Sequence, residues 1–201
     1  MERTVFASNN PGKVAEIEAL LQPAGVQLLP QSACGVPEAE ETGLTFVENA
    51  LLKARNACRH TGLPAIADDS GIEVDALGGE PGIHSARYAG EHGDDAANNS
   101  VLLAELAGVP DARRTARFRC VLVYLRHAED PAPRICEGVW EGRILPEARG
   151  EGGFGYDPLF WVPDHGCSAA ELPAETKNAL SHRGKALRAL LASLRDHPPL
   201  Q

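Results

Sequence analysis

Two long segments of alternating side chains limit what this chain can fold into more than any other feature. Residues 116–128 read ARFRCVLVYLRHA, and residues 134–145 read RICEGVWEGRIL. Alternation of apolar and polar residues is typical of strands whose two faces meet different surroundings. We therefore predict two long antiparallel strands here.

Helices and a further strand are predicted in the first third of the chain. Residues 4–8 predict a strand, and Asn10 before Pro11 predicts the start of a helix. Thr45 and Glu48 form a capping-box pattern at the start of a second helix. That helix is expected to bury the apolar side chains of Val47, Ala50, Leu51, Ala54 and Cys58.

Three more segments complete the pattern. The residues on either side of Ser70-Gly71 predict two short strands or a hairpin. Residues 95–107 predict a third helix, and a last helix is expected from near Ser181, with an apolar stripe of leucines. The expected fold class is α/β: a mixed, largely antiparallel extended sheet with flanking helices, in one domain over residues 1–201.

Composition excludes several classes of protein. The chain has 201 residues and a formal net charge of -9, which argues against a nucleic-acid binder, because such proteins neutralise phosphates with a basic surface. The five cysteines form no C-x-x-C pair, so reduced thiols are expected rather than a zinc site. Neither a signal peptide nor an apolar run long enough to span a membrane is evident, and we expect a cytoplasmic protein without a membrane partner.

The stretch AIADDSG, residues 65–71, places two adjacent carboxylates after an apolar run. A buried carboxylate is costly unless a cation or several donors compensate it. Mg²⁺ takes oxygen ligands from one or two carboxylates. Adjacent residues of a strand point to opposite sides, so we expect one of Asp68 and Asp69 to serve as ligand or base and the other to hold structure.

The segment SNNPGK, residues 8–13, turns from a strand into a helix. The first N–H groups of a helix are free to bind an anion, and Lys13 lies in that first turn. The alternative is an ordinary capped helix with a solvated lysine. A Walker A loop is excluded, because its G-x-x-x-x-G-K-[ST] pattern occurs nowhere in the chain.

The segment GEGGFGYDP, residues 150–158, contains a G-x-G-x-x-G pattern that is not a dinucleotide fingerprint. The fingerprint needs a helix after its glycines, and Tyr156-Asp157-Pro158 cannot open one. We interpret the segment as a glycine loop against a flat ligand, with Phe154 or Tyr156 as an aromatic face and Asp157 as an acceptor. A tight turn with core aromatics is the alternative.

Charged residues gather in three further places. Lys177, His182 and Arg183 surround the start of the last helix and could bind an anion or a base. The acidic segment EAEETG, residues 38–43, precedes the second helix, and Lys53 lies four residues after Asn49 on one helical face. A solvated surface is the alternative for each of them, and acid clusters before a helix are usually solvated. Together, however, carboxylates, cations, helix starts and a glycine-aromatic loop indicate a nucleoside triphosphate site.

The segments SNNPGK, TGLTFVENALLKA, AIADDSGIEVDALGGEPGIHSARY, GEGGFGYDP and AELPAETKNALSHRGKAL resemble, in order, the signature blocks of the inosine triphosphate pyrophosphatase family, and most closely its bacterial members. The resemblance spans nearly the whole chain. It implies Mg²⁺-dependent hydrolysis of dITP, ITP, dXTP and XTP to the monophosphate and pyrophosphate. It also implies a homodimer and an α/β fold with two lobes around a central cleft.

The resemblance further implies a role for individual residues. Asp69 would be the general base and a metal ligand, with Glu40 or Glu41 as the second metal ligand. The expected substrate-binding residues are Ser8, Asn9, Asn10, Pro11, Gly12, Lys13, Lys53, Ser70, Phe154, Gly155, Tyr156, Asp157, Lys177, His182 and Arg183.

Two alternative functions stay open at this point. A non-catalytic nucleotide sensor would bind substrate without forming product, and a related pyrophosphatase would prefer pyrimidine or methylated bases.

Overall fold

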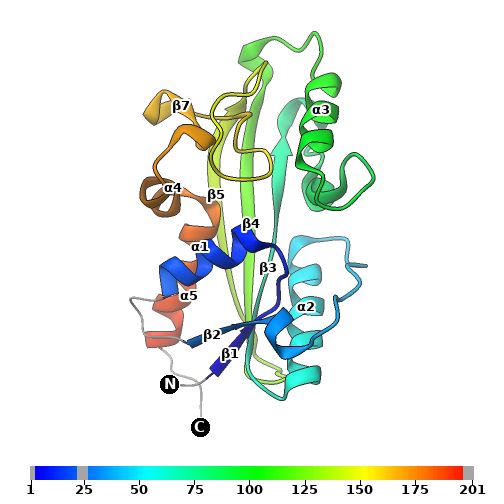
Figure 1. Cartoon of the computed structure of the whole chain (residues 1–201), viewed down its shortest axis with the longest axis vertical. Helices are drawn as coiled ribbons and strands as arrows, with labels where there is room; N and C mark the ends of the chain where they lie inside the picture. The colour runs from blue at the N-terminus through cyan, green and yellow to red at the C-terminus, as the bar shows by residue number, and fades with distance from the viewer. Residues whose placement is uncertain (1–2, 22–26, 197–201) are drawn as a thin grey trace. The chain divides into compact units, whose positions relative to one another are not determined.

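The computed structural model describes residues 3–21 and 27–196. These residues form seven strands and five α-helices. Figure 1 labels most of them. The strands are β1 (Arg3–Phe6), β2 (Gln27–Pro30), β3 (Ala65–Val74), β4 (Thr115–Leu125), β5 (Arg134–Ile144), β6 (Phe160–Val162) and β7 (Cys167–Ser168). The helices are α1 (Pro11–Leu21), α2 (Phe46–Thr61), α3 (Asp95–Glu105), α4 (Ala174–Leu180) and α5 (His182–Asp196).

The strands form one mixed sheet, in the order β2-β1-β3-β4-β5-β6-β7. Strand β1 pairs in parallel with both β2 and β3. Strands β5, β6 and β7 pair antiparallel in succession. The predicted α/β class with a mixed sheet is therefore confirmed, and so are the two long strands, now β4 and β5.

The chain divides into two compact units. Unit 1 comprises residues 1–69, 120–138 and 182–201, and unit 2 comprises residues 70–119 and 139–181. Strands β3, β4 and β5 contribute residues to both units. Two units agree with the two expected lobes, whereas the expected cleft and the single domain over residues 1–201 stay predictions.

Unit 1 is built on both faces of its strands. Figure 1 shows α2 on one side of these strands and α1 with α5 on the other. The apolar stripes of α1 and α5 meet the sheet in a buried cluster that includes Ile17, Leu187 and Leu190. Phe6 of β1 and Leu122 of β4 supply the sheet side of this cluster. Each such side chain contributes about 1.5–3 kcal/mol by leaving water, so the cluster fixes α1 and α5 against the strands.

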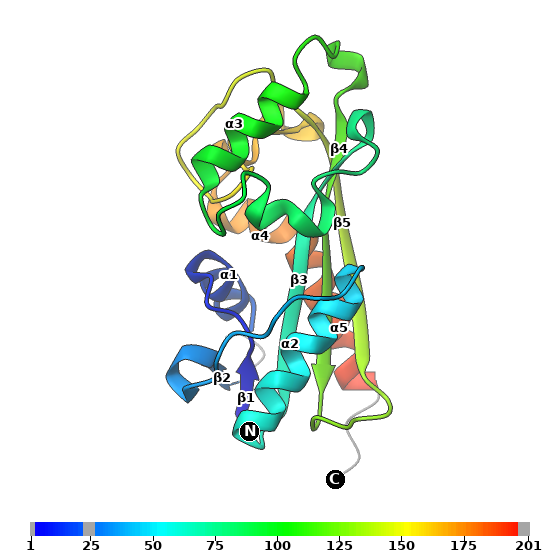
Figure 2. The same cartoon turned by 90° about the vertical axis from the view of Figure 1, so that its right-hand side faces the viewer.

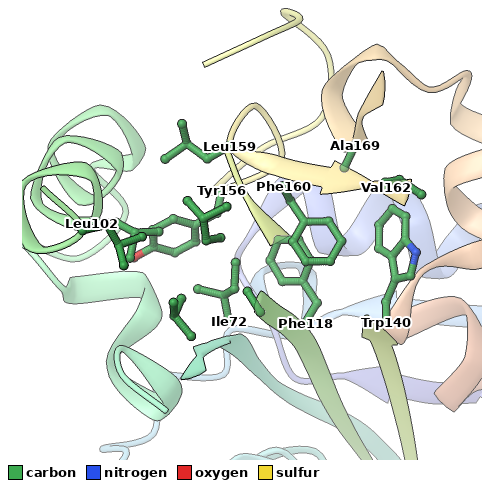
Figure 3. Packing of buried hydrophobic residues seen from close by; sticks show 13 residues of the cluster. Ile72, Leu102, Phe118, Trp140, Tyr156, Leu159, Phe160, Val162 and Ala169 are labelled. Carbon is green, nitrogen blue, oxygen red and sulfur yellow. The ribbon is translucent and has the colours of Figure 1, made fainter. Parts of the chain in front are cut away.

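Unit 2 has its own aromatic core. The rings of Phe118 and Phe160 have centroids 4.5 Å apart, and those of Trp140 and Phe160 have centroids 5.1 Å apart. Figure 3 shows this group in the same layer as Tyr156, which lies against Leu102 of α3. The core therefore joins β4, β5 and β6 to α3 and to the glycine loop.

The helix starts follow the sequence closely. The side chain of Asn10 accepts a hydrogen bond from the Lys13 N–H at 3.0 Å, and Pro11 is the first residue of α1. Thr45 caps α2 by accepting from the Glu48 N–H at 3.3 Å. The predicted buried face of α2 holds for Ala50, Ala54 and Cys58, but Val47 and Leu51 are only partly buried. The buried face instead includes Phe46, Asn49 and Ala57.

The prediction of a break or hairpin at Ser70-Gly71 is wrong, because β3 runs without interruption from Ala65 to Val74. Gly71 serves a close approach rather than a turn. A Cβ atom at this position would lie 2.2 Å from the carbonyl oxygen of Gly82 and 2.5 Å from Oγ of Ser85. The neighbouring Ile72 N–H donates to that Ser85 hydroxyl at 2.9 Å. Only a glycine at position 71 lets the segment of residues 82–85 pack against β3.

The last part of the chain holds two helices where one was predicted. The short helix α4 carries Lys177, and Ser181 ends it before α5 begins at His182. Among residues 3–21 and 27–196, no helix is both long and apolar enough to cross a membrane.

Candidate active site

Strand β3 directs Asp68 and Asp69 to different partners. The Asp68 carboxylate lies 3.0 Å from Nζ of Lys13, and that of Asp69 lies 3.1 Å from Nζ of Lys53. The predicted opposite orientation of the two side chains is therefore confirmed. Both residues lie inside the strand rather than at its end, because β3 continues through Ser70-Gly71. Both are also almost fully buried, with exposed fractions of 1% and 5%.

Asp68 belongs to a buried ion-pair group with cations on two helices. Its Oδ2 atom accepts from Nε and Nη2 of Arg183, each at 3.4 Å, as well as from Lys13. Arg183 also pairs with Glu16 of α1 through Nη1. Burial alone would raise the pKa of Asp68, but Lys13, Arg183 and Lys53 outweigh it and hold this pKa well below its usual range. Asp68 is therefore a permanent anion that holds cations in place.

Asp69 has a different electrostatic environment. Burial is the largest influence and raises its pKa, with a further contribution from Glu41, while Lys53 and Lys13 act in the opposite direction. The net pKa of Asp69 is raised above that of an ordinary aspartate. A carboxylate with a raised pKa binds a proton more readily, which is the property that a general base needs.

Lys53 of α2 links Asp69 to the acidic segment before that helix. Its Nζ atom lies 2.7 Å from Oε1 of Glu41 and 3.1 Å from Oδ1 of Asp69. Burial opposes the charge on Lys53, but the carboxylates of Asp69, Asp68 and Glu41 outweigh it and raise its pKa. Of the two glutamates left open by the sequence, Glu41 is the one joined to Asp69 through this lysine, whereas Glu40 is exposed.

Asn49 was not predicted as a site residue. The sequence showed only that it lies four residues before Lys53. Its Nδ2 atom donates to Oδ2 of Asp69 at 3.3 Å, and its Oδ1 atom accepts from the Gly43 N–H at 2.8 Å. The side chain is fully buried on α2. An amide one turn before a lysine, on a helix with an apolar face, is the signal that could have identified it, since polar groups that become buried need partners.

The segment of residues 8–13 forms the start of α1 beside Lys13. Asn9 and Asn10 are exposed, and Asn9 donates to Oε1 of Glu38 at 2.8 Å. The Asn10 N–H donates to Oγ of Ser8 at 3.3 Å. Because Gly12 lies in the first turn, its N–H has no acceptor within the helix. The helix start and the Lys13 ammonium together can attract an anion.

The glycine loop lies in unit 2 and is closed by Asp157. The Oδ2 atom of Asp157 accepts from the Phe154 N–H at 2.8 Å and from Nζ of Lys177 at 2.6 Å. That ammonium also lies over the Phe154 ring, 4.7 Å from its centroid. Tyr156 is buried and donates its hydroxyl to the Ser85 carbonyl at 2.7 Å. Of the two predicted aromatic faces, Phe154 is therefore the more accessible.

The predicted residues divide between the two units. Unit 1 contains residues 8–13, Lys53, Asp69, His182 and Arg183, and unit 2 contains Ser70, the residues of the glycine loop and Lys177. Within unit 1, Lys13, Lys53 and Arg183 all lie within the two carboxylate clusters described above. His182 is buried at the start of α5, where its carbonyl leaves room only for a glycine at position 138 of β5.

The arrangement in unit 1 is suited to a phosphate ester or anhydride. It offers two lysines and a helix start for negative charge, beside a carboxylate with a raised pKa. Oxygen ligands are what Mg²⁺ prefers, and Asp69 and Glu41 bring two carboxylates to one ammonium group. In the part of the chain described by the structure, no three His, Cys, Asp or Glu side chains form a metal-binding group. Two carboxylates alone would leave the other ligands of such an ion to water and substrate.

Comparison with known proteins places these observations in a family. The model of the Ham1 family matches residues 4–193. The chain is 64% identical to the dITP/XTP pyrophosphatase of Thioalkalivibrio sulfidiphilus, over 96% of this chain and 98% of that protein. It is 59% identical to the dITP/XTP pyrophosphatase of Salmonella paratyphi A, over 98% of this chain and 100% of that protein.

Solved structures agree with the sequence comparison. A HAM1 protein from Coxiella burnetii has a TM-score of 0.89 and 49% identity, covering 98% of this chain and 100% of its own. A nucleoside-triphosphatase / dITP/XTP pyrophosphatase from Mycobacterium abscessus has a TM-score of 0.74 and 47% identity, covering 94% of this chain and 98% of its own. The resemblance seen in the sequence motifs is thus confirmed over almost every residue, and the chain belongs to the Ham1 family.

Proposed function

We propose that this protein hydrolyses non-canonical purine nucleoside triphosphates, namely dITP, ITP, dXTP and XTP, to the monophosphate and pyrophosphate. One observation carries the proposal: two adjacent buried carboxylates of β3 pair with two different lysines, one of which lies at a helix start. Membership of the Ham1 family and the names of its relatives support the choice of a purine triphosphate.

The triphosphate is proposed to bind at the start of α1. Ser8, Asn9, Asn10, Pro11 and Gly12 supply the helix start, and Lys13 adds a cation that is already held by Asp68. Lys53 supplies a second cation on the other side of β3. These fixed groups would stabilise the charge on the departing pyrophosphate. Such electrostatic stabilisation supplies most of the catalysis of phosphoryl transfer.

Asp69 is the proposed general base. It takes a proton from a water molecule whose oxygen attacks the α-phosphorus, while the bond from that phosphorus to the bridging oxygen breaks and pyrophosphate leaves. The raised pKa of Asp69 favours this proton transfer. The Asn49 amide and the Lys53 ammonium hold the carboxylate in one orientation for it.

We propose Mg²⁺ as the cofactor, held by Asp69 and Glu41 together with phosphate oxygens. When bound, it would neutralise phosphate charge that the lysines do not reach. Glu40 is the less suitable of the two glutamates, because it is exposed, whereas Glu41 contacts Lys53.

The purine base is proposed to meet the glycine loop. Phe154 offers a ring face, Gly155 allows close approach of backbone, and Asp157 with Lys177 fixes the shape of the loop. Tyr156 would contribute through its backbone, since its side chain is buried. Ser70, at the start of unit 2, is proposed to contact the substrate as well.

His182 and Arg183 at the start of α5 are the proposed donors toward the 6-oxo group. Adenine would present a 6-amino donor there and leave buried donors unpaired, so ATP would be a poor substrate. Because the Arg183 guanidinium already pairs with Asp68 and Glu16, we expect much of its effect to pass through Asp68.

The working form is proposed to be a homodimer of single-domain chains in the cytoplasm, without nucleic-acid or membrane partners. The resemblance to the family supports the dimer, and the net charge of -9 supports the absence of nucleic acid. Light scattering on a sizing column would measure the mass of the particle.

A panel of nucleoside triphosphates tests the proposed function. We expect pyrophosphate release from ITP, dITP and XTP with Mg²⁺, far less from ATP, GTP or pyrimidine nucleotides, and none after addition of EDTA until Mg²⁺ is restored. Binding of ITP without product would instead identify a nucleotide sensor. Preference for a pyrimidine or methylated base would identify the related class of pyrophosphatase.

A further inference from the structure

Helix α3 binds the glycine loop through the backbone N–H and the carbonyl of a single residue, Gly155. The Gly155 N–H donates to Oδ2 of Asp95 at 2.6 Å, and the Gly155 carbonyl accepts from Nδ2 of Asn99 at 2.9 Å. Residues four apart on a helix share one face, so the two side chains act as a pair. Figure 2 shows the yellow loop that leads into this contact passing beside α3.

The contact bears on the part of the loop proposed to meet the base. Gly155 has a φ of +62°, a conformation that other residues rarely adopt. The preceding Phe154 N–H is held by Asp157 at 2.8 Å. Two successive N–H groups are thus bound by two carboxylates, which fixes the backbone that carries the Phe154 side chain.

The same helix also holds the segment that anchors Tyr156. Asn98 is buried, accepts from the Ala89 N–H at 2.8 Å and donates to the Ala86 carbonyl at 3.3 Å. Ala86 directly follows Ser85, whose carbonyl accepts a hydrogen bond from the Tyr156 hydroxyl. Consecutive residues of the loop, Gly155 and Tyr156, are therefore fixed to α3 directly and through residues 85–89.

We propose that Asp95, assisted by Asn99, is a positioning residue for purine recognition: it holds Gly155 so that Phe154 presents its ring to the base. The inference rests on the proposed function. A hydrogen bond to an ionised acceptor is stronger than one between neutral groups, so Asp95 is the more important member of the pair. The contact of Asp95 is with the Gly155 backbone, so its effect is on how well the purine base binds.

Three variants test this role. Asp95→Ala removes the acceptor, and Asp95→Asn keeps an oxygen at the same place. Asp94→Ala is the matched control, because Asp94 caps α3 by accepting from the Ala97 N–H at 2.9 Å and is not bonded to the loop. Thermal melts of the three proteins show whether Asp95→Ala and Asp94→Ala weaken the fold to a similar extent.

The kinetic readout is the steady-state hydrolysis of ITP and ATP. For Asp95→Ala we expect KM for ITP to rise about tenfold with kcat almost unchanged, and KM for ATP to rise by a similar factor, because a misplaced ring face weakens the binding of any purine. Asp95→Asn should recover most of the lost affinity, and Asp94→Ala should keep kcat and KM within about twofold of the wild type. A purely structural role would lower kcat as well as raise KM, because less of the protein would be correctly folded.

Two results separate the possible failures. If wild-type protein releases pyrophosphate from ITP but Asp95→Ala behaves like Asp94→Ala, the positioning role is overturned and the proposed function stands. If the wild-type protein releases none from any nucleotide, the proposed function is overturned, and this inference with it.

Discussion

Asp68 and Asp69 are adjacent in the chain, yet their carboxylates pair with different lysines, Lys13 at 3.0 Å and Lys53 at 3.1 Å. Their pKa values move in opposite directions, downward for Asp68 and upward for Asp69, because only Asp68 has cations enough to outweigh its burial. Two carboxylates whose environments separate their pKa values have different chemical roles. We assign structure and charge balance to Asp68, and proton transfer to Asp69.

The substitution Asp69→Asn is therefore expected to abolish turnover in a folded protein. The amide can still hydrogen-bond but is a poor base and a poor metal ligand, so kcat should fall at least about 100-fold. The rate of pyrophosphate release measures kcat. Isothermal titration calorimetry measures nucleotide binding, which should persist. Asp130→Asn, a buried aspartate in the β4–β5 turn, is the control for loss of a carboxylate elsewhere. Retention of more than about a tenth of the rate would remove Asp69 as the base.

Lys13→Ala should raise KM and lower kcat, each roughly tenfold, since the ammonium meets phosphates in the ground state and charge on the leaving group. Steady-state kinetics with ITP separate the two effects. Lys185→Ala removes an equal charge from an exposed position of α5 and should leave both constants unchanged. Equal kinetics for wild type and Lys13→Ala would show that phosphates bind elsewhere than the start of α1.

Local patterns predicted much of the fold. The Asn10 and Thr45 caps, the alternation in β4 and β5 and the leucine stripe of α5 all depend on residues close in sequence. Such features are determined by residues that are neighbours in the sequence, so they can be predicted without a structure. The opposite directions of Asp68 and Asp69 followed from strand geometry in the same way, but their lysine partners did not.

Other features depend on residues far apart. Ser70-Gly71 has the composition of a turn, but Gly71 is required by the backbone of Gly82, which no local pattern shows. Arg183 has the sequence setting of a ligand-binding cation, yet its guanidinium pairs with Glu16 and Asp68. Glu16 and Asp95 gave no signal, because an acid on a helix is usually solvated and only the folded chain brings it to a partner.

Stability should depend on pH through Asp130. Its carboxylate is held by the Arg126 side chain and by the N–H groups of Arg126 and Ala132, and these keep its pKa well below the usual range. A lowered pKa in the folded state means that this stabilisation is present above the unfolded value, about 3.9, and is lost as the pH falls through the folded value. Melting temperatures measured from pH 7 downward should show a steeper acid loss for the wild type than for Asp130→Asn. Glu147→Gln, which removes an exposed carboxylate, should follow the wild type.

The buried pair of Arg183 and Glu16 should be strongly coupled. Arg183→Met leaves the carboxylates of Glu16 and Asp68 buried with fewer cations, and removal of one partner of a buried pair costs about 3–5 kcal/mol. Glu16→Gln should cost less, because Arg183 keeps Asp68. In the double variant the uncompensated charge is smaller, so its loss of unfolding free energy should fall short of the sum by roughly 0.5–3 kcal/mol. Urea unfolding of the four proteins measures this coupling, and strict additivity would contradict it.

The same four proteins, assayed with ITP and ATP, separate two roles of Arg183. Equal losses of kcat/KM for both nucleotides indicate that Arg183 acts through Asp68. A loss confined to ITP indicates that its guanidinium contacts the 6-oxo group.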